Sequence, residues 1–363
     1  MIKESDYYNI SDDIEAYPDA WIYLITGGRG TGKTYSSLVH CLKTKSKFVF
    51  LKRTLDDVNL LCAGHSKLGQ KQADYGVDFS PFKSINRDFG TRIEAYGIRD
   101  GIGGFWECGE EGEPKGMPIG YIFALSGVTK FKGFDLSDCD YLIFDEFIPN
   151  IYDRVNRNEG EQLLDLYMTV SRDREQRGKP PLKIICLANA TSISNPTFNI
   201  LEVTDTVVKM EGTGKEVFYD PDRFIFLRRL PDDSNLVKAQ KQTAIYKAMG
   251  DTEWGSMSFD NKFAYNDFSN VQHVKLKNYR PLCSVKYKKE TWYIYEKEYK
   301  YYICRSQHNG DLEYDLNLEN DQKLFYYDQV IDLKNACIEG DLKTETYTMY
   351  DLIINYKKFF KNI

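Results

Sequence analysis

The chain has 363 residues, of which 54 are acidic and 48 basic, so its formal net charge is −6. This length is sufficient for two or three domains with buried cores. The net negative charge argues against a protein that coats nucleic acid with its whole surface, although it allows local basic patches. No apolar run reaches the length of a membrane span, and the polar, acidic N-terminus is unlike a signal peptide. We therefore expect a soluble intracellular protein with no membrane partner.

The eight cysteines and four histidines are scattered along the chain, and no C-x-x-C pair occurs among them. Both disulfide frameworks and zinc sites need such residues at characteristic spacings. The pattern predicts reduced thiols and neither kind of site.

The first predicted element is a strand at residues 21–26, "WIYLIT", followed by a glycine-rich loop and a helix that begins near residue 35. The spacing in the loop fits the Walker A pattern, in which backbone N–H groups and a helix N-terminus surround phosphate groups. A turn that binds nothing is the alternative, and the strand–loop–helix context argues against it. The predicted ATP-binding residues are Gly27, Gly28, Arg29, Gly30, Thr31, Gly32, Lys33 and Thr34. Within this loop, Lys33 is expected to reach the β- and γ-phosphates, and the Thr34 hydroxyl to bind Mg²⁺.

Further strands are predicted at 47–53, 92–98, 120–126, 141–147 and 182–189, several of them apolar without alternation. Such strands are typical of a sheet that is covered on both faces, so the prediction is an open, mostly parallel α/β sheet. The segment 99–118 is rich in Gly and Glu, and we expect a mobile hairpin tip there with no chemical role.

The strand at 141–147, "YLIFDEF", has the features of a Walker B motif. Asp145 is expected to belong to the Mg²⁺ shell, and Glu146 to orient and deprotonate a water that attacks the γ-phosphate. A P-loop kinase has no use for a water-activating Glu at this position. Hydrolysis, and hence motor or switch work, is therefore favoured over phosphorylation of a small molecule.

Two further features fit a motor. Asn189 ends an apolar strand, where its amide could contact the γ-phosphate; a turn-forming role is the alternative. The segment 171–179 contains Arg172, Arg174, Arg177 and Lys179. This cluster is either a solvated face, a kinase-like lid, or the source of an arginine that completes a neighbouring subunit's site in a ring.

The last third of the chain has a different character. An amphipathic helix is predicted after Pro231, with Asp233 or Ser234 as its N-cap. Residues 281–307 predict an antiparallel meander and 348–360 a closing helix. We place a P-loop ATPase domain at 1–232, a helical linker at 233–268, and a small α+β domain at 269–363.

The motifs "GGRGTGKT", "LIFDEFI", "TVSRDRE", "IICLANATSISNP" and "GDTEWGSMSFDNKF" occur in this order over residues of about 20–265. In them the chain resembles the DNA encapsidation (genome packaging) ATPases of small tailed phages of the phi29 type. The longer Gly/Glu loop and the C-terminal third match this family less well.

The resemblance implies an additional-strand (ASCE) P-loop ATPase that forms a homo-oligomeric ring, a pentamer, on the portal of an empty prohead. Such a ring drives double-stranded DNA inward, in some cases with a packaging RNA. It acts in the host cytoplasm, transiently at the portal vertex, and is absent from the mature virion. By the same resemblance, Arg172 is the arginine that acts in trans, and Lys132, with Lys130 close by in register, takes part in the nucleotide cycle.

In related terminases the C-terminal domain is an RNase H-like nuclease, which needs carboxylates that converge on metal ions. The first strand of the predicted meander carries no acid, so we expect a vestigial, inactive relative of that fold. The acids nearby are Glu290, Glu296, Glu298, Asp311, Glu313 and Asp315.

A translocating motor grips DNA through phosphates rather than bases. Lys52, Arg53, Lys130 and Lys132 are candidates for such contacts. The C-terminal lysines and arginine suit a phosphate- or RNA-facing surface or a solvated edge, namely Lys275, Lys277, Arg280, Lys286, Lys288 and Lys289.

Three alternatives to a packaging ATPase stay open. One is another additional-strand translocase or helicase, and the second is a packaging terminase with an active nuclease. The third is a nucleotide-binding scaffold that hydrolyses ATP slowly or not at all. Glu146 argues against the scaffold.

Overall fold

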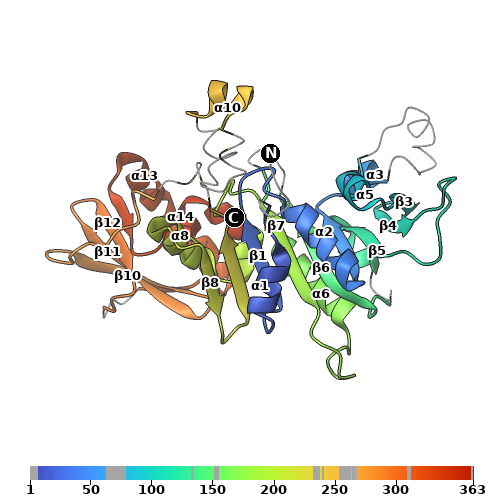
Figure 1. Ribbon diagram of the computed structural model, residues 1–363. Coiled ribbons are helices and arrows are strands. Elements are labelled where there is room, and N and C mark those ends of the chain that lie inside the picture. Colours follow the sequence, from blue (N-terminus) through green and yellow to red (C-terminus); the bar gives the residue numbers. More distant parts are fainter. Residues whose placement is uncertain are drawn as a thin grey trace. The chain divides into compact units, whose positions relative to one another are not determined.

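The computed structural model describes residues 7–62, 79–131, 135–150, 155–231, 238, 241–252, 263, 266, 268–308, 312–360 and 363, without the side chains of 129–131. The chain forms two compact units (Figure 1). The first comprises Met1–Leu201 and Met210–Tyr265, and the second Glu202–Lys209 and Asn266–Ile363. The domain boundaries expected from the sequence stay a prediction.

The first unit contains a nine-stranded sheet with a parallel centre. Six neighbouring strands run parallel, and antiparallel pairing occurs at both edges, between β3, β4 and β5 and between β8 and β9. In spatial order the strands are β3 (Ile93–Arg99), β4 (Ile102–Glu107), β5 (Gly120–Ala124), β2 (Lys47–Lys52), β6 (Cys139–Asp145), β7 (Lys183–Ala188), β1 (Ile22–Thr26), β9 (Ile225–Arg229) and β8 (Val217–Asp220). The mostly parallel α/β sheet predicted from the sequence is confirmed.

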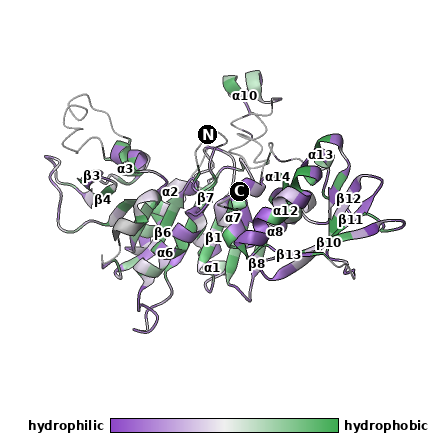
Figure 2. Ribbon diagram, turned by 180° about the vertical axis from the view of Figure 1, so that it is seen from behind, coloured by the Kyte–Doolittle hydropathy of each residue, from purple (hydrophilic) through white to green (hydrophobic). Residues whose placement is uncertain are grey.

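Alternate residues of the central strands point to opposite faces of the sheet. Tyr23 and Ile25 of β1 belong to a buried cluster with Leu38 of α2 (Lys33–Thr44) and Ile10 of α1 (Ile10–Ala16), so these two helices cover one face. The central strands are coloured as hydrophobic in Figure 2. This explains their unbroken apolar runs, because both faces are buried.

Several further helices belong to this unit. They are α3 (Leu55–Leu61), α5 (Lys83–Phe89), the 3₁₀ helix η3 (Leu125–Phe131), α6 (Glu159–Ser171), α7 (Pro196–Ile200), α8 (Thr204–Thr213), which extends into both units, and α10 (Ala244–Met249). None of the helices in the described part of the chain is long and apolar enough to span a bilayer.

One prediction for this unit is wrong. The Gly/Glu-rich segment is not all loop, because Ile102–Glu107 forms β4, which pairs with both β3 and β5. A Cβ on Gly103 would lie 2.5 Å from Cys62 Sγ, and one on Gly104 would lie 2.7 Å from the Trp106 ring. The glycines that suggested a loop are required by close packing inside the strand.

The helix predicted after Pro231 is confirmed only in its last part, because residues 241–243 form a turn and a bend and the helix α10 begins after its N-cap Thr243. The helix α10 buries none of its residues. Residues 232–237, 239 and 240, which include the expected caps Asp233 and Ser234, lie outside the described part of the chain. Most of the motif at 250–263 also lies outside the described residues.

The second unit contains a five-stranded sheet. Its spatial order is β13 (Glu313–Asp315), β10 (Arg280–Tyr287), β11 (Glu290–Lys297), β12 (Lys300–Cys304) and β14 (Leu342–Thr344). The strands β10, β11 and β12 are antiparallel, which confirms the predicted meander. Trp292, Phe325 and Tyr356 lie in the core between this sheet and its helices. These helices are α12 (Glu319–Phe325), the π-helical turn η4 (Tyr326–Val330), α13 (Ile331–Glu339), α14 (Tyr347–Ile354) and α15 (Tyr356–Phe359).

Candidate nucleotide-binding site

The glycine-rich loop lies between the end of β1 and the start of α2. Gly30 and Gly32 have φ of 72° and 87°, in the left-handed region that favours glycine. A Cβ on Gly27 would lie 2.7 Å from Leu230 Cδ1, so this position also requires glycine. The loop and the first turn of α2 thus have the backbone conformation of a site suited to phosphate groups.

Lys33 is buried in this loop and interacts with its backbone. Its ammonium donates to the carbonyl oxygens of Gly27 at 2.9 Å and Gly28 at 2.8 Å, and to Thr31 Oγ1 at 3.2 Å. Burial lowers the pKa of Lys33 to about 8, although the nearby Asp145 carboxylate acts in the opposite direction. Because burial disfavours the charge of Lys33, its ammonium is suited to exchange its carbonyl partners for phosphate oxygens.

The two predicted Mg²⁺ ligands meet although they lie far apart in the sequence. Thr34 Oγ1 donates to Asp145 Oδ1 at 2.9 Å. A hydroxyl and a carboxylate are hard oxygen donors, and Mg²⁺ in nucleotide sites takes one or two carboxylates together with phosphates and water. No group of three or more His, Cys, Asp or Glu side chains that could hold a metal occurs among the residues with described positions. The pair therefore fits a Mg²⁺ ion that is bound together with a nucleotide.

Glu146 follows β6 directly and has an unusual backbone. Its φ of 61° is in the left-handed region, which is uncommon for a residue with a side chain. Its side chain is 64% exposed, so the carboxylate is available to solvent at the edge of the site. Strain of this kind is often concentrated at functional positions.

Lys52 and Arg53, expected from the sequence to contact DNA, have partners inside the site. The Lys52 ammonium lies 2.9 Å from Asp145 Oδ2 and 3.5 Å from Glu146 Oε2. Burial lowers the pKa of Lys52, but these two carboxylates outweigh burial, so the pKa is raised overall. Arg53 donates to Glu159 Oε2 at 2.8 Å and to the carbonyl oxygen of Glu146 at 2.9 Å.

Sequence reasoning missed this role of Lys52, although a signal existed. Lys52 ends β2, and β2 pairs in parallel with β6, the Walker B strand. Parallel neighbours end at the same edge of a sheet, so a charged residue at the end of β2 is expected near Asp145.

Asn189 follows β7 and lies in the same cavity. Its Oδ1 is 3.4 Å from the Lys33 ammonium. The structure thus brings Asn189 together with the predicted phosphate-binding and metal-binding residues.

Arg172 lies away from this site. It follows the last residue of α6 with φ of 41°, and its Nη1 is 3.8 Å from Asp135 Oδ1. The beginning of α6 contacts Arg53 near the carboxyl end of β6, whereas Arg174, just beyond its end, contacts Cys139 at the start of β6. Seven strand residues separate these ends, a span of roughly 20 Å. Arg172 therefore does not reach its own pocket.

Arg174, the other candidate in the cluster, has a structural role. Its side chain is buried and pairs with Asp140, and its Nη1 donates to the carbonyl oxygen of Cys139 at 2.6 Å. Lys132 lies outside the described residues, and the side chain of Lys130 on η3 is not described either.

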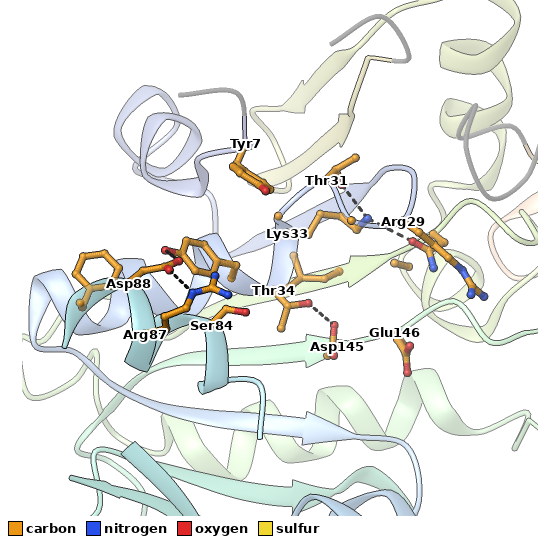
Figure 3. A pocket seen from close by; sticks show the side chains of 17 residues that line it. Tyr7, Arg29, Thr31, Lys33, Thr34, Ser84, Arg87, Asp88, Asp145 and Glu146 are labelled. Carbon is orange, nitrogen blue, oxygen red and sulfur yellow. Dashed lines mark hydrogen bonds and ion pairs between the residues drawn. The ribbon is translucent and has the colours of Figure 1, made fainter. Parts of the chain in front are cut away.

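The glycine-rich loop with Lys33 and Thr34, the Walker B pair and Asn189 line one cavity of about 720 Å³ (Figure 3). This volume is in the usual range for a small-molecule site. Its other walls come from residues that the sequence did not indicate, namely Tyr7, Tyr35, Ser84, Arg87, Asp88 and Phe89.

Comparison with known proteins gives a family. The family model for the podovirus DNA encapsidation protein (Gp16) matches residues 115–329, more than half of the chain. The chain belongs to this encapsidation family.

Two relatives of this encapsidation protein are the DNA packaging proteins of Bacillus phages B103 and phi29. The first is 26% identical over 278 residues, which cover 74% of this chain and 72% of the relative. The second is 25% identical over 251 residues, which cover 68% of this chain but only 63% of the relative.

Two solved structures share the fold of this family member. A chain of the Phi-28 gp11 DNA packaging motor superimposes with a TM-score of 0.63 at 18% identity, and the match covers 99% of both chains. A chain of the bacteriophage Phi-29 genome packaging motor assembly gives the same TM-score at 19% identity, with 97% of this chain and 99% of the other covered.

Proposed function

We propose that this protein is an ATP-hydrolysing ring motor that translocates double-stranded viral DNA into a preformed prohead. One observation carries the proposal: Lys33, Thr34, Asp145 and Glu146 converge at one edge of the sheet in a member of the encapsidation family. The relatives from phages B103 and phi29 are DNA packaging proteins, which supports the same assignment.

The order of the strands supports a hydrolase of the additional-strand type. The Walker A strand β1 and the Walker B strand β6 are not neighbours, because β7 lies between them. In this arrangement the additional strand ends beside the γ-phosphate position, and here its end carries Asn189. Asn189 is therefore suited to respond to the loss of that phosphate.

Each polar group then has a role. Lys33 and the backbone N–H groups of the loop bind the phosphates, and Thr34 and Asp145 hold Mg²⁺, which would neutralise charge on the β- and γ-phosphates. Glu146 orients a water and accepts its proton as the water attacks. Lys52, which contacts both carboxylates, positions Glu146 and Asp145.

Arg172 lies near the amino end of β6, whereas the site lies at the carboxyl ends of the strands. This position supports action in trans. A neighbouring subunit that meets this end of the strands would receive the guanidinium in its own site, as in other ring ATPases with an arginine finger. We propose a homo-oligomeric ring on this basis, a pentamer by resemblance. Its further partners are the portal of the prohead, double-stranded DNA and a packaging RNA.

The second unit is proposed to be a vestigial RNase H-like domain. The acids expected to be nearest to a metal site are ion-paired instead: Glu290 with Arg305 at 3.0 Å and Asp315 with Lys286 at 3.2 Å. Glu296 pairs with Arg280 in the same way. The protein would act in the host cytoplasm and at the portal vertex, without entering the mature virion.

The test measures ATP turnover and the protection of double-stranded DNA from nuclease in the presence of empty proheads. Wild-type turnover is expected to rise with DNA and proheads together. Lys33→Ala is expected to lose nucleotide binding or turnover, whereas Glu146→Gln keeps ATP binding and loses hydrolysis, because it removes the base but leaves Asp145 intact.

Glu161→Gln, an exposed position on α6, is the matched control and keeps normal turnover. Normal hydrolysis in Glu146→Gln would contradict the assignment of the base. Unwinding of forked DNA that needs no prohead would favour a helicase instead.

A further inference from the structure

The cavity extends beyond the groups that bind phosphate and Mg²⁺. In Figure 3, Ser84, Arg87 and Asp88 lie on one side of Thr34, and Glu146 lies on the other. These additional residues belong to α5, and Tyr7 comes from the N-terminal segment. With the γ-phosphate end marked by Lys33, Asp145 and Asn189, the remainder of a bound nucleotide would extend towards α5 and Tyr7.

Aromatic rings line this part of the cavity. The ring centroids of Tyr7 and Tyr35 are 6.4 Å apart, with their planes inclined by 33°. Tyr7 is 39% exposed and Phe89 42% exposed, although both are large hydrophobic residues. Aromatic faces that stay accessible inside a cavity are suited to stack on a nucleobase.

A carboxylate lies beside these rings. Asp88 accepts hydrogen bonds from Tyr35 Oη at 3.0 Å and from Arg87 Nε at 2.9 Å. The hydrogen bond from Arg87 is the main cause that lowers the pKa of Asp88, so the group is ionised at neutral pH. An ionised carboxylate only accepts hydrogen bonds and has lone pairs for more than two donors. Its ligand must therefore supply an N–H or an O–H.

The N-terminal segment is attached to the phosphate-binding loop. The backbone N–H of Tyr8 donates to the Thr31 carbonyl oxygen at 3.1 Å, and that of Ile10 to Ser36 Oγ at 2.7 Å. A Cβ on Gly32 would lie 2.9 Å from Tyr7 Cδ1, so the ring packs directly over the loop. This attachment fixes Tyr7 next to the start of α2.

We propose that Tyr7, Tyr35 and Asp88 form a nucleoside subsite, in which the two rings stack on the base and Asp88 accepts a hydrogen bond from the nucleoside. The donor is either the exocyclic amine of adenine or a ribose hydroxyl. The subsite rests on the proposed binding of ATP at the loop. It assigns the selection of the nucleotide to the N-terminal segment and α5, outside the Walker motifs.

The first experiment compares two ligands by calorimetry, with Mg²⁺ present: the slowly hydrolysed analogue ATPγS and inorganic tripolyphosphate. Tyr7→Ala is expected to weaken ATPγS binding by roughly 5- to 150-fold, the loss of one base–aromatic stack, and to change tripolyphosphate binding less than about twofold. The control Tyr299→Ala removes a tyrosine that is 80% exposed on the second unit and leaves both affinities unchanged.

Equal losses for the two ligands would mean that Tyr7 only supports the loop, and an unchanged ATPγS affinity would also overturn the subsite. Absence of binding of both ligands to the wild-type protein would instead contradict the proposed function itself.

The second experiment tests Asp88 with three nucleotides. Asp88→Ala is expected to lower ATP affinity several-fold and to abolish one preference of the wild type. Loss of the preference for ATP over GTP identifies the adenine amine as the donor, and loss of the preference for ATP over dATP identifies the ribose. Asp220→Ala, which removes another Asp that is paired with an Arg but lies outside this cavity, is the control. If Asp88→Ala keeps both preferences and its affinity, Asp88 is not part of the subsite.

Discussion

At the scale of single residues, the site combines buried and strained groups. Lys33 is an almost fully buried ammonium that is paired with carbonyl oxygens, and Glu146 has a left-handed backbone. Burial disfavours the charge of Lys33, and the left-handed region is unfavourable for a residue with a side chain. Both place a polar group where a phosphate or a water would meet it, which is typical of a site whose preorganisation is part of its function.

The lowered pKa of Lys33 predicts how nucleotide affinity depends on pH. The pKa is about 8 in the protein without nucleotide, and phosphate oxygens favour the protonated form. Binding is therefore coupled to proton uptake when the pH exceeds this value. ATPγS affinity is expected to be nearly constant between about pH 7 and 7.5 and to fall by up to about tenfold per pH unit above pH 8.

Calorimetry at several pH values checks this expectation. Lys33→Arg is the control, because a guanidinium stays charged throughout this range. Its affinity is expected to be lower overall but independent of pH between about 8 and 9.5. An equally flat profile for the wild type would show that Lys33 stays protonated in the free protein.

At the scale of elements, the strand ends organise the site. The carboxyl ends of β1, β2, β6 and β7 supply the loop, Lys52, the Walker B pair and Asn189. The helix α6 extends from this edge to the opposite one and has Arg172 at its far end. One element therefore links a subunit's own site to the edge that a neighbouring subunit would meet.

Complementation between two inactive variants tests action in trans. Arg172→Ala is expected to leave ATP binding nearly intact and to lower turnover by about 10³- to 10⁵-fold, the usual contribution of an arginine finger. Mixing it with Glu146→Gln protein restores part of the turnover, because some interfaces then join an intact Glu146 to an intact Arg172.

The buried Arg174 offers a contrasting variant. Arg174→Ala is expected to reduce thermal stability, since it leaves Asp140 and the Cys139 carbonyl oxygen without their partner.

If Arg172→Ala and Glu146→Gln proteins co-assemble but regain no ATP turnover at any mixing ratio, Arg172 acts in cis.

At the scale of the whole molecule, the two units differ in chemistry. The first unit brings the two Walker B acids, Asp145 and Glu146, into one cavity. In the second unit, three of the acids near the meander, Glu290, Glu296 and Asp315, are paired with Arg305, Arg280 and Lys286. Carboxylates that are neutralised in this way do not converge on a metal ion.

The purified protein is therefore expected not to cut DNA with Mg²⁺ or Mn²⁺. Conversion of supercoiled plasmid to nicked or linear forms is the measurement, and Lys33→Ala protein serves to remove any effect of the motor. Metal-dependent nicking that persists in Lys33→Ala would contradict the proposal of a vestigial nuclease.

The sequence by itself determined the features that depend on neighbouring residues. The Walker A loop, the Walker B pair, the central strands and the antiparallel meander are local patterns of glycine, charge and apolar periodicity, so they were predicted at nearly the right bounds. The proximity of Asp145 to Thr34 also followed, because both motifs end strands of one parallel sheet.

Only the tertiary structure decided what depends on packing between distant segments. It showed β4, whose Gly103 fits against Cys62, and it paired β2 with β6, which places Lys52 on the Walker B carboxylates. It also brought Tyr7 and Asp88 to the nucleotide cavity and separated Arg172 from it. These positions are set by contacts between residues tens to more than a hundred positions apart, and no local pattern records such contacts.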